Sequence, residues 1–284
     1  MSETGRDSRS SARGPDVSAE GSGGALIDVP GVPGFWTRVR EASWRCLVLD
    51  YDGTLAPFHR DRMSAFPLDG VVPLLERIRD GGGTHLAIMT GRPLSELLTL
   101  LGELNIPVSA SQGTEFHYPN GTDFRVEPRA EQSERLDRAM REATELGLGG
   151  AIERKNSSVA LHTRPMEADE AAAAEERLEA VWSVDSAENG LEVRRFLGGI
   201  ELRVLGIDKG TALLELLGET PPGGLCVYVG DDDTDEDALE VVRKLGIGIK
   251  VGSPRRPTHA RGRLGSPEDV RAMLTGWVQV TKGR

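Results

Sequence analysis

Two aspartates, Asp50 and Asp52, stand one residue apart where an apolar segment runs into a glycine. Residues 47–55 read LVLDYDGTL. In an open parallel sheet, ligands bind beyond the carboxyl ends of the strands. Because residues i and i+2 of an extended segment point the same way, both carboxylates could address one substrate atom and one cation. The alternative is an ordinary strand-to-turn exit, since Asp and Gly both favour turns.

A second apolar segment ends in a similar way. Residues 88–93 read IMTGRP, so Thr90 and Gly91 precede a predicted helix whose first residue can be proline. A threonine hydroxyl and free backbone N–H groups at the start of a helix suit a phosphate. For Thr90 taken alone, a simple N-cap is the alternative interpretation.

A lysine opens a third predicted element. Residues 206–214 read GIDKGTALL, which places Lys209 at the start of an amphipathic helix. Lysine is generally favoured at the other end of a helix, so this position suggests a bound anion. A solvated surface lysine is the alternative.

The strongest concentration of charge follows an apolar strand predicted at residues 225–229. Six of the seven residues from 231 to 237 are acidic. Such runs are usually solvated, and acids are favourable at a helix start. This run, however, would meet Asp50 at one edge of the sheet, where so many carboxylates require a neutralising cation. Ligands that are all oxygen indicate a hard divalent ion such as Mg²⁺.

The elements that position these residues alternate between short apolar runs and amphipathic runs. This alternation predicts an α/β fold, a doubly wound parallel sheet with helices on both faces. The runs lie early and late in the chain, so both parts are expected to form one domain. The predicted strands and helices occupy residues 46–49, 71–78, 86–89, 94–101, 225–229, 234–245 and 247–251.

The intervening residues differ in character and predict a second, inserted α+β domain. Residues 127–146 and 166–182 are charged and amphipathic, as in helices that cover a sheet. Residues 158–164 and 200–204 alternate with period two, which places His162 and Arg164 on one face of a strand. We expect helices behind a small sheet whose polar face is left open. The predicted division is a disordered tail at 1–34, a core at 35–112 and 206–284, and a cap at 113–205.

Composition excludes several classes of function. The chain has 284 residues, with 34 basic and 45 acidic side chains and a net charge of −11, which argues against nucleic-acid and anionic-membrane partners. No apolar stretch is long enough for a membrane span, and the N-terminus lacks the apolar block of a secretory signal, so we expect a cytoplasmic protein. Cys46 and Cys226 lie in apolar runs and are expected to be reduced core thiols.

Four motifs in this order resemble those of the haloacid-dehalogenase (HAD) phosphohydrolase superfamily, and the insertion resembles its type-two cap. More narrowly, the chain resembles the trehalose-6-phosphate phosphatases over roughly residues 40–276. This narrower resemblance rests on three segments, GDDDTDEDA at 230–238, ELR at 201–203 and GIKVG at 248–252.

The resemblance implies a Mg²⁺-dependent hydrolysis of trehalose 6-phosphate to trehalose and phosphate. Asp50 would be the nucleophile that forms an aspartyl-phosphate, and Asp52 would be the acid and base. Thr90 and Lys209 would hold the phosphoryl oxygens. The implied substrate-binding residues are Thr90, Gly91, Arg92, Lys155, His162, Arg164 and Glu201, and the implied metal residues are Asp50, Asp52 through its carbonyl, Asp231, Asp232 and Asp235.

Departures from the family pattern leave the substrate open. The family often has His-Gly-x-Glu after the second motif, whereas this chain has Gln112 at the position of the histidine. A phosphatase for another disaccharide, pseudo-disaccharide, glycosyl-glycerate or sucrose phosphate is therefore an alternative. A non-catalytic regulatory partner of a glycosyltransferase is an alternative of a different class. We expect a small-molecule sugar phosphate as the partner, and a monomer.

Overall fold

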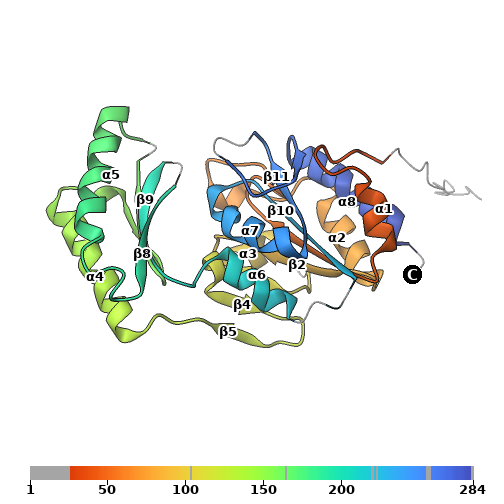
Figure 1. The fold of residues 1–284 in the computed structure, drawn as a ribbon, viewed down its shortest axis with the longest axis horizontal. Coiled ribbons are helices and arrows are strands. Elements are labelled where there is room, and N and C mark those ends of the chain that lie inside the picture. The colour runs from red at the N-terminus through yellow and green to blue at the C-terminus, as the bar shows by residue number, and fades with distance from the viewer. Residues whose placement is uncertain are drawn as a thin grey trace, which may run out of the picture.

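The computed structural model consists of two lobes, each built on its own β-sheet (Figure 1). It describes residues 26–102, 104–163, 165–196, 198–218, 221, 223–253 and 257–282. The larger lobe holds an eight-stranded sheet and the smaller lobe a four-stranded sheet. The chain passes into the smaller lobe and returns to the larger one.

The eight strands of the core sheet have the order β12-β11-β10-β1-β2-β3-β4-β5. The pairs from β12 to β3 are parallel, whereas β3 pairs with β4, and β4 with β5, in antiparallel fashion. The strands are β1 (Trp44–Asp50), β2 (His85–Met89), β3 (Val108–Ala110), β4 (Glu115–His117), β5 (Asp123–Arg125), β10 (Gly224–Gly230), β11 (Gly246–Val251) and β12 (Gly262–Leu264).

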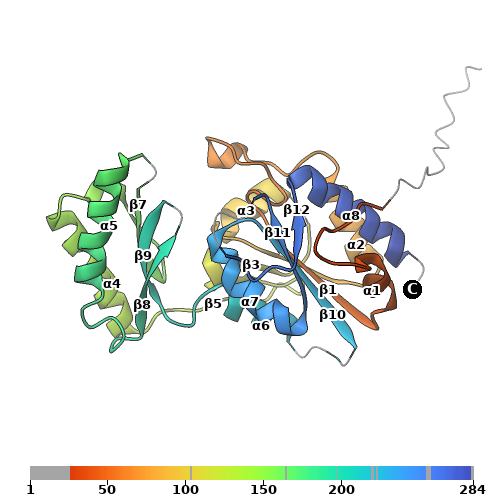
Figure 2. The same ribbon diagram turned by 45° about the horizontal axis from the view of Figure 1, so that its top comes forward.

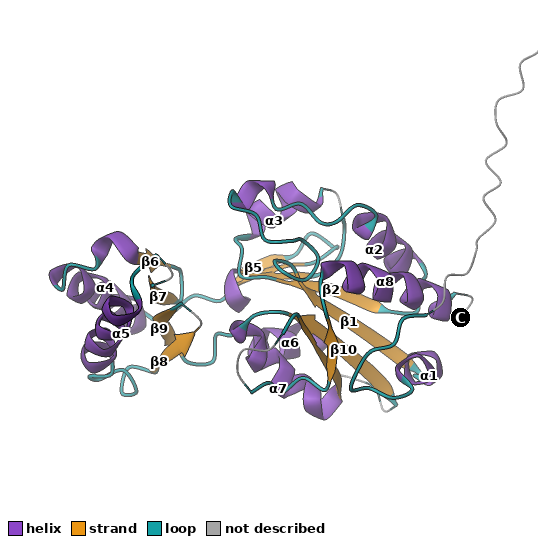
Figure 3. Cartoon of the chain, turned by 90° about the horizontal axis from the view of Figure 1, so that it is seen from above, coloured by secondary structure: helices purple, strands orange, loops and turns teal. Residues whose placement is uncertain are grey.

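Helices cover both faces of this sheet, which confirms the doubly wound α/β fold (Figure 3). The side chains of one face pack against α1, α2, α3 and α8, and those of the other against α6 and α7. The helices are α1 (Phe35–Glu41), α2 (Val71–Asp80), α3 (Leu94–Leu101), α6 (Lys209–Leu217), α7 (Glu236–Leu245) and α8 (Pro267–Thr281), with short 3₁₀ turns η1 (Arg62–Ser64), η2 (Ser111–Gly113) and η4 (Asp233–Asp235).

Strand β1 shows why the sheet is buried on both sides. Leu47 and Leu49 belong to one apolar cluster, and Cys46 and Val48 to the other. Because successive side chains of a strand point to opposite faces, an uninterrupted apolar run supplies both layers. Cys46 lies opposite Cys226 of β10, and both are buried free thiols, as predicted.

The boundary expected after residue 112 is wrong, because strands β4 and β5 extend the core sheet. The residues between them, Tyr118 to Thr122, form a hairpin turn in which Gly121 has a φ of 81°. Phe116 packs into the core cluster shared with α6 and α7. This packing keeps the hairpin in the core, so the chain enters the cap only after Arg125.

The expected tail boundary is also wrong at its C-terminal end. Residues 26–34 pack on the core, where Val29 and Val32 are buried. The Arg263 amide donates a hydrogen bond to the Pro30 carbonyl. Gly31 has a φ of 86°, and a Cβ there would lie 2.1 Å from a backbone carbonyl oxygen. The remainder of the predicted tail, residues 1–25, lies outside the described residues.

The cap is a four-stranded antiparallel sheet of order β6-β7-β9-β8 backed by two helices (Figure 2). Its apolar side chains, such as Val159 and Leu202, pack against α4 and α5. The opposite, polar face of the sheet looks toward the core. The elements are α4 (Ala130–Glu145), η3 (Gly149–Ala151), β6 (Ile152–Arg154), β7 (Ser158–His162), α5 (Ala168–Trp182), β8 (Leu191–Phe196) and β9 (Gly199–Val204).

Within the described part of the chain, no helix is both long and apolar enough to cross a membrane.

Candidate active site

Three neighbouring strands deliver the motif residues to one edge of the core sheet. Asp50 is the last residue of β1, which lies between β10 and β2. Thr90 follows β2 directly, and Asp231 follows β10 directly. Because the three strands are parallel and in register, their carboxyl ends meet at this edge.

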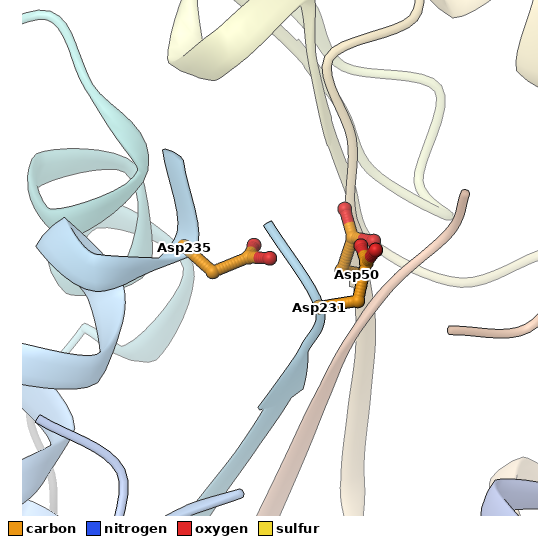
Figure 4. Close-up of side chains that lie close together, drawn as sticks. All are labelled: Asp50, Asp231 and Asp235. Carbon is orange, nitrogen blue, oxygen red and sulfur yellow. The ribbon is translucent and has the colours of Figure 1, made fainter. Parts of the chain in front are cut away.

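The carboxylates of Asp50, Asp231 and Asp235 form a cluster in which Asp50 and Asp235 are buried and Asp231 is half-buried (Figure 4). One oxygen from each lies within 4.8 Å of the others. Burial raises the pKa of Asp50 to about 7, and burial together with the charge of Asp50 raises the pKa of Asp231 to about 9. The Oδ1 atom of Asp231 is buried without a hydrogen-bond partner in the described structure. An acid-rich site with an unpartnered oxygen fits a hard divalent cation.

A glycine makes room for this cluster. Gly53 has a φ of 75°, a left-handed conformation that glycine adopts readily. A Cβ at this position would lie 2.3 Å from Oδ2 of Asp231. The DYDG turn therefore brings its backbone against the carboxylate at the end of the neighbouring strand.

Lys209 lies at the centre of the site, at the first position of α6. Its buried Nζ donates to Oδ1 of Asp50 at 2.7 Å and to Oδ1 of Asp235 at 2.6 Å. Burial opposes its charge, but the two carboxylates keep the pKa of Lys209 well above its ordinary value. A fixed cation is thus held next to Asp50, where it can bind a phosphoryl oxygen.

Asp235 is engaged by protein donors on both of its oxygens. Besides Lys209, the hydroxyl of Tyr228 donates to Oδ1 and the amide of Asp232 donates to Oδ2. Burial would raise the pKa of Asp235, but Lys209 and Tyr228 hold it below its ordinary value. These contacts suit a residue that orients Lys209. The direct cation ligands are then best sought in Asp50 and Asp231.

The Asp232 side chain does not join the cluster. Its carboxylate accepts a hydrogen bond from the Asp233 amide at the start of η4. Its backbone carbonyl accepts a hydrogen bond from Nζ of Lys250, which also contacts Glu236. Asp232 thus stabilises the loop between β10 and η4, and Lys250 on β11 binds the backbone of the same loop. Sequence reasoning missed Lys250 and Tyr228 because each sits in an otherwise apolar strand.

Arg92 makes a contact that the sequence analysis did not predict. Its buried guanidinium pairs with Asp52 through Nε and Nη2, each at 2.6 Å. Its predicted role in binding substrate stays a prediction. Its Nη1 donates to the backbone carbonyl of Arg62. The Asp52 side chain is partly exposed and lies beside the cluster rather than in it.

Thr90 and Gly91 follow the end of β2, and their predicted contact with a phosphate stays a prediction. The buried Thr90 hydroxyl accepts a hydrogen bond from the Arg92 amide, as in a turn, and the Thr90 amide is bound to the Ser109 carbonyl. Gly91 lies against Gln112, whose Nε2 would be 2.6 Å from a Cβ at residue 91. The glutamine that departs from the family pattern thus packs directly on the second motif.

Glu201 and His162 of the cap sheet, and Lys155 in the loop after β6, lie on the side of the cap that faces the core. Glu201 accepts a hydrogen bond from the Ser158 hydroxyl at 2.6 Å, and Lys155 lies 3.5 Å from it. His162 is bound to Glu153 at 2.8 Å. This hydrogen bond lowers the pKa of Glu153 to about 2.

The sequence analysis did not predict Glu153 as a site residue. Its position directly before the charged pair Arg154-Lys155 could have indicated that it belongs to the same polar group. A cavity of about 610 Å³ at this end of the cap sheet is lined by Glu153, His162 and Arg62 of the core. Arg164 lies outside the described residues.

The core fold and this strand-edge arrangement of carboxylates and lysine define the class of protein. It has the HAD fold with an inserted cap. A structure of the C-terminal domain of the trehalose-6-phosphate phosphatase of C. albicans superposes with a TM-score of 0.73 at 23% identity, covering 87% of this chain and 96% of that one.

The chain belongs to the trehalose-phosphatase family, whose model matches residues 48–268. It is 32% identical over 239 residues to a bifunctional trehalose-6-phosphate synthase/phosphatase of Thermoproteus tenax, which covers 82% of this chain and 32% of that protein. It is 30% identical over 232 residues to a probable trehalose-phosphate phosphatase of Sinorhizobium fredii, which covers 80% of this chain and 85% of that protein. The chain therefore spans about a third of the first relative and most of the second.

Proposed function

We propose that this protein hydrolyses trehalose 6-phosphate to trehalose and phosphate, with Mg²⁺ as cofactor. The observation that carries the proposal is the contact between Lys209 and Asp50 beside Asp231, below a polar cap face. Membership of the trehalose-phosphatase family supports the substrate. The lysine supplies the charge that a phosphate dianion needs, and the cap face offers hydrogen-bonding groups to a sugar.

In the proposed first half-reaction, a carboxylate oxygen of Asp50 attacks phosphorus and the bond from phosphorus to the sugar oxygen breaks. Asp52 gives its proton to the departing sugar oxygen, which leaves as trehalose. Lys209 binds a phosphoryl oxygen throughout, so that charge developing on the phosphoryl group meets a cation already in place.

In the second half-reaction, water attacks the phosphorus of the aspartyl-phosphate while Asp52 takes a proton from that water. The acyl-phosphate bond breaks, inorganic phosphate leaves and Asp50 is restored as a carboxylate. Mg²⁺, held by Asp50, Asp231 and the backbone carbonyl of Asp52, would offset repulsion between these carboxylates and the phosphate dianion.

The cap would select the sugar. Glu201 would accept hydrogen bonds from sugar hydroxyls, together with Lys155 and His162 beside it. A regulatory partner without catalysis is disfavoured, because Asp50, Asp52, Lys209 and Asp231 are all present at the sheet edge. A phosphatase for a different disaccharide phosphate would share this core and differ in the cap.

Phosphate release by the purified protein tests the proposal. The substrates are trehalose 6-phosphate, glucose 6-phosphate, sucrose 6-phosphate and glucosyl-3-phosphoglycerate, each with Mg²⁺ or with EDTA. We expect a strong Mg²⁺-dependent preference for trehalose 6-phosphate. Preference for another substrate of the panel would show that trehalose 6-phosphate is not the substrate, and the proposed phosphatase reaction would still hold. If the protein released no phosphate from any substrate of the panel or from an aryl phosphate, the proposed phosphatase activity would be wrong.

A further inference from the structure

One carboxylate of the core binds two arginines of the cap. Asp237 lies in the first turn of α7, and Nη1 of Arg194 lies 2.6 and 2.7 Å from its two oxygens. Nη1 of Arg203 donates to Oδ2 of the same carboxylate at 2.9 Å. Arg203 is also paired with Glu192 at 2.6 Å. Arg194, Arg203 and Asp237 together form what we call the cap–core clamp.

On the cap side, the clamp shares a sheet face with Glu201. Arg194 is the cross-strand partner of Glu201, and Arg203 is two residues further along β9. Because side chains at i and i+2 of a strand point the same way, both arginines project from the face that carries Glu201. The position of Glu201 over the core therefore depends on where the two arginines are anchored.

On the core side, the clamp is tied to the phosphoryl site. Asp237 is two residues from Asp235, which binds Lys209. The Asp237 carbonyl lies 2.8 Å from where a Cβ on Gly210 would stand, so α6 and α7 are in direct contact. Since Lys209 opens α6, the same two helices hold the clamp carboxylate and the phosphate-binding lysine.

The environment of the clamp favours a persistent contact. An exposed ion pair usually contributes little, because water screens it and two long side chains lose freedom. Here the Arg203 and Asp237 side chains are only 13% and 19% exposed, and one carboxylate is shared by two guanidinium groups. The cap is also attached covalently by two chain crossings, one on each side of it. A charged contact between the lobes is thus well placed to set the cap orientation.

We infer that Arg194 and Arg203 are positioning residues that bind Asp237 and so hold Glu201 over Asp50 and Lys209. This inference rests on the proposed function, because it assigns the two arginines to substrate selection by the cap. They act on the substrate through the position of Glu201. A substrate that needs the cap should depend on the clamp, whereas a small aryl phosphate should depend on it much less.

The test compares Asp237→Asn, Arg194→Met and the double variant on trehalose 6-phosphate and p-nitrophenyl phosphate. Asp237→Asn keeps the shape of the side chain and removes its charge. We expect the KM for the sugar phosphate to rise about ten-fold or more, within the usual range for coupling between sites. The change for the aryl phosphate should be several-fold smaller. The double variant should lose no more than Asp237→Asn alone, because Asp237→Asn already removes the charge that Arg194 binds.

Arg195→Met is the matched control. Arg195 is the next residue on β8 and about as exposed as Arg194, but it pairs with Glu175 and Glu179 inside the cap. Its loss removes the same charge without touching the clamp and should leave the KM for the sugar phosphate unchanged. A rise in KM equal to that of Arg194→Met would overturn the inference.

Small-angle X-ray scattering of the substrate-free protein gives a readout that does not need activity. We expect a larger radius of gyration for Asp237→Asn than for wild type and Arg195→Met. Equal losses on both substrates, or no change in KM and in radius of gyration, would overturn the inference. If wild type rejected trehalose 6-phosphate, the proposed function would fail, and the scattering comparison would still decide whether the clamp holds the cap.

Discussion

The guanidinium of Arg92 binds both carboxylate oxygens of Asp52, with two nitrogen to oxygen distances of 2.6 Å. The two residues are 40 positions apart and follow neighbouring strands. Such a planar two-point contact fixes the direction of a carboxylate. Arg92 is thus placed to orient the residue that we propose as acid and base.

Arg92→Met should therefore slow the departure of poor leaving groups. We expect kcat/KM for the sugar phosphate to fall by about ten-fold or more, part of the usual contribution of a general acid. For p-nitrophenyl phosphate the fall should be much smaller, because nitrophenolate leaves without a proton. Glu96→Gln is the control, since Glu96 touches Arg92 only at 3.6 Å and does not touch Asp52. Equal falls on both substrates would show that Arg92 has only a structural role.

Asp50→Asn should abolish turnover, because an amide cannot form the covalent intermediate. The fold should survive, since the side chain keeps its size and Lys209 keeps Asp235 as a partner. Phosphate release and thermal unfolding of the same preparation measure both effects. Activity close to wild type would rule out covalent catalysis through Asp50.

Without a cation, stability should fall as pH rises from about 4 to about 9. Asp50 and Asp231 have folded-state pKa values of about 7 and about 9, above the ordinary value of about 4. From about pH 4 up to these folded-state pKa values, the folded protein binds more protons at Asp50 and Asp231 than the unfolded chain does. The contribution of the two protonated groups to the free energy of unfolding is therefore present at low pH and is lost as pH rises.

Mg²⁺ should reverse this loss, because it replaces the protons that offset the charge of the cluster. At a concentration one hundred times its Kd it would add about 2.7 kcal/mol to the free energy of unfolding. Melting temperatures measured in EDTA and in Mg²⁺ across this pH range test the expectation. A gain from Mg²⁺ that is no larger at pH 8 than at pH 5 would contradict it.

Glu201→Ala should cause a large loss on the sugar phosphate and a much smaller loss on a small aryl phosphate. Glu201 lies on the open face of the cap sheet, where it is bound by Ser158. Glu179→Gln is a suitable control, because Glu179 pairs with Arg195 elsewhere in the cap. The measurement is kcat/KM on the two substrates. A loss of the same size on both would show that Glu201 has only a structural role in the cap.

Local pattern was sufficient to predict the strand-end residues, strands β1, β2, β7, β9, β10 and β11, and helices α2 to α7. It did not predict α1, α8, β3 to β6, β8 or β12. Apolar runs followed by Asp50, Thr90 and Asp231 place these residues at carboxyl ends, and a parallel sheet brings such ends together. Lys209 was predicted at a helix start and opens α6. The antiparallel hairpin β4–β5 was assigned to the cap, because its short strands show no signal of which sheet they join.

The contacts between side chains were decided by the tertiary structure. Sequence analysis did not predict the contact between Arg92 and Asp52, and only the packing of β1 beside β2 shows that Asp52 lies within reach of Arg92. The binding of Asp237 by Arg194 and Arg203 likewise depends on how the cap sheet sits over α7. The physical reason is that periodicity determines which face of an element is buried, whereas a pair of charges meets only when the register and orientation of two distant elements are set together.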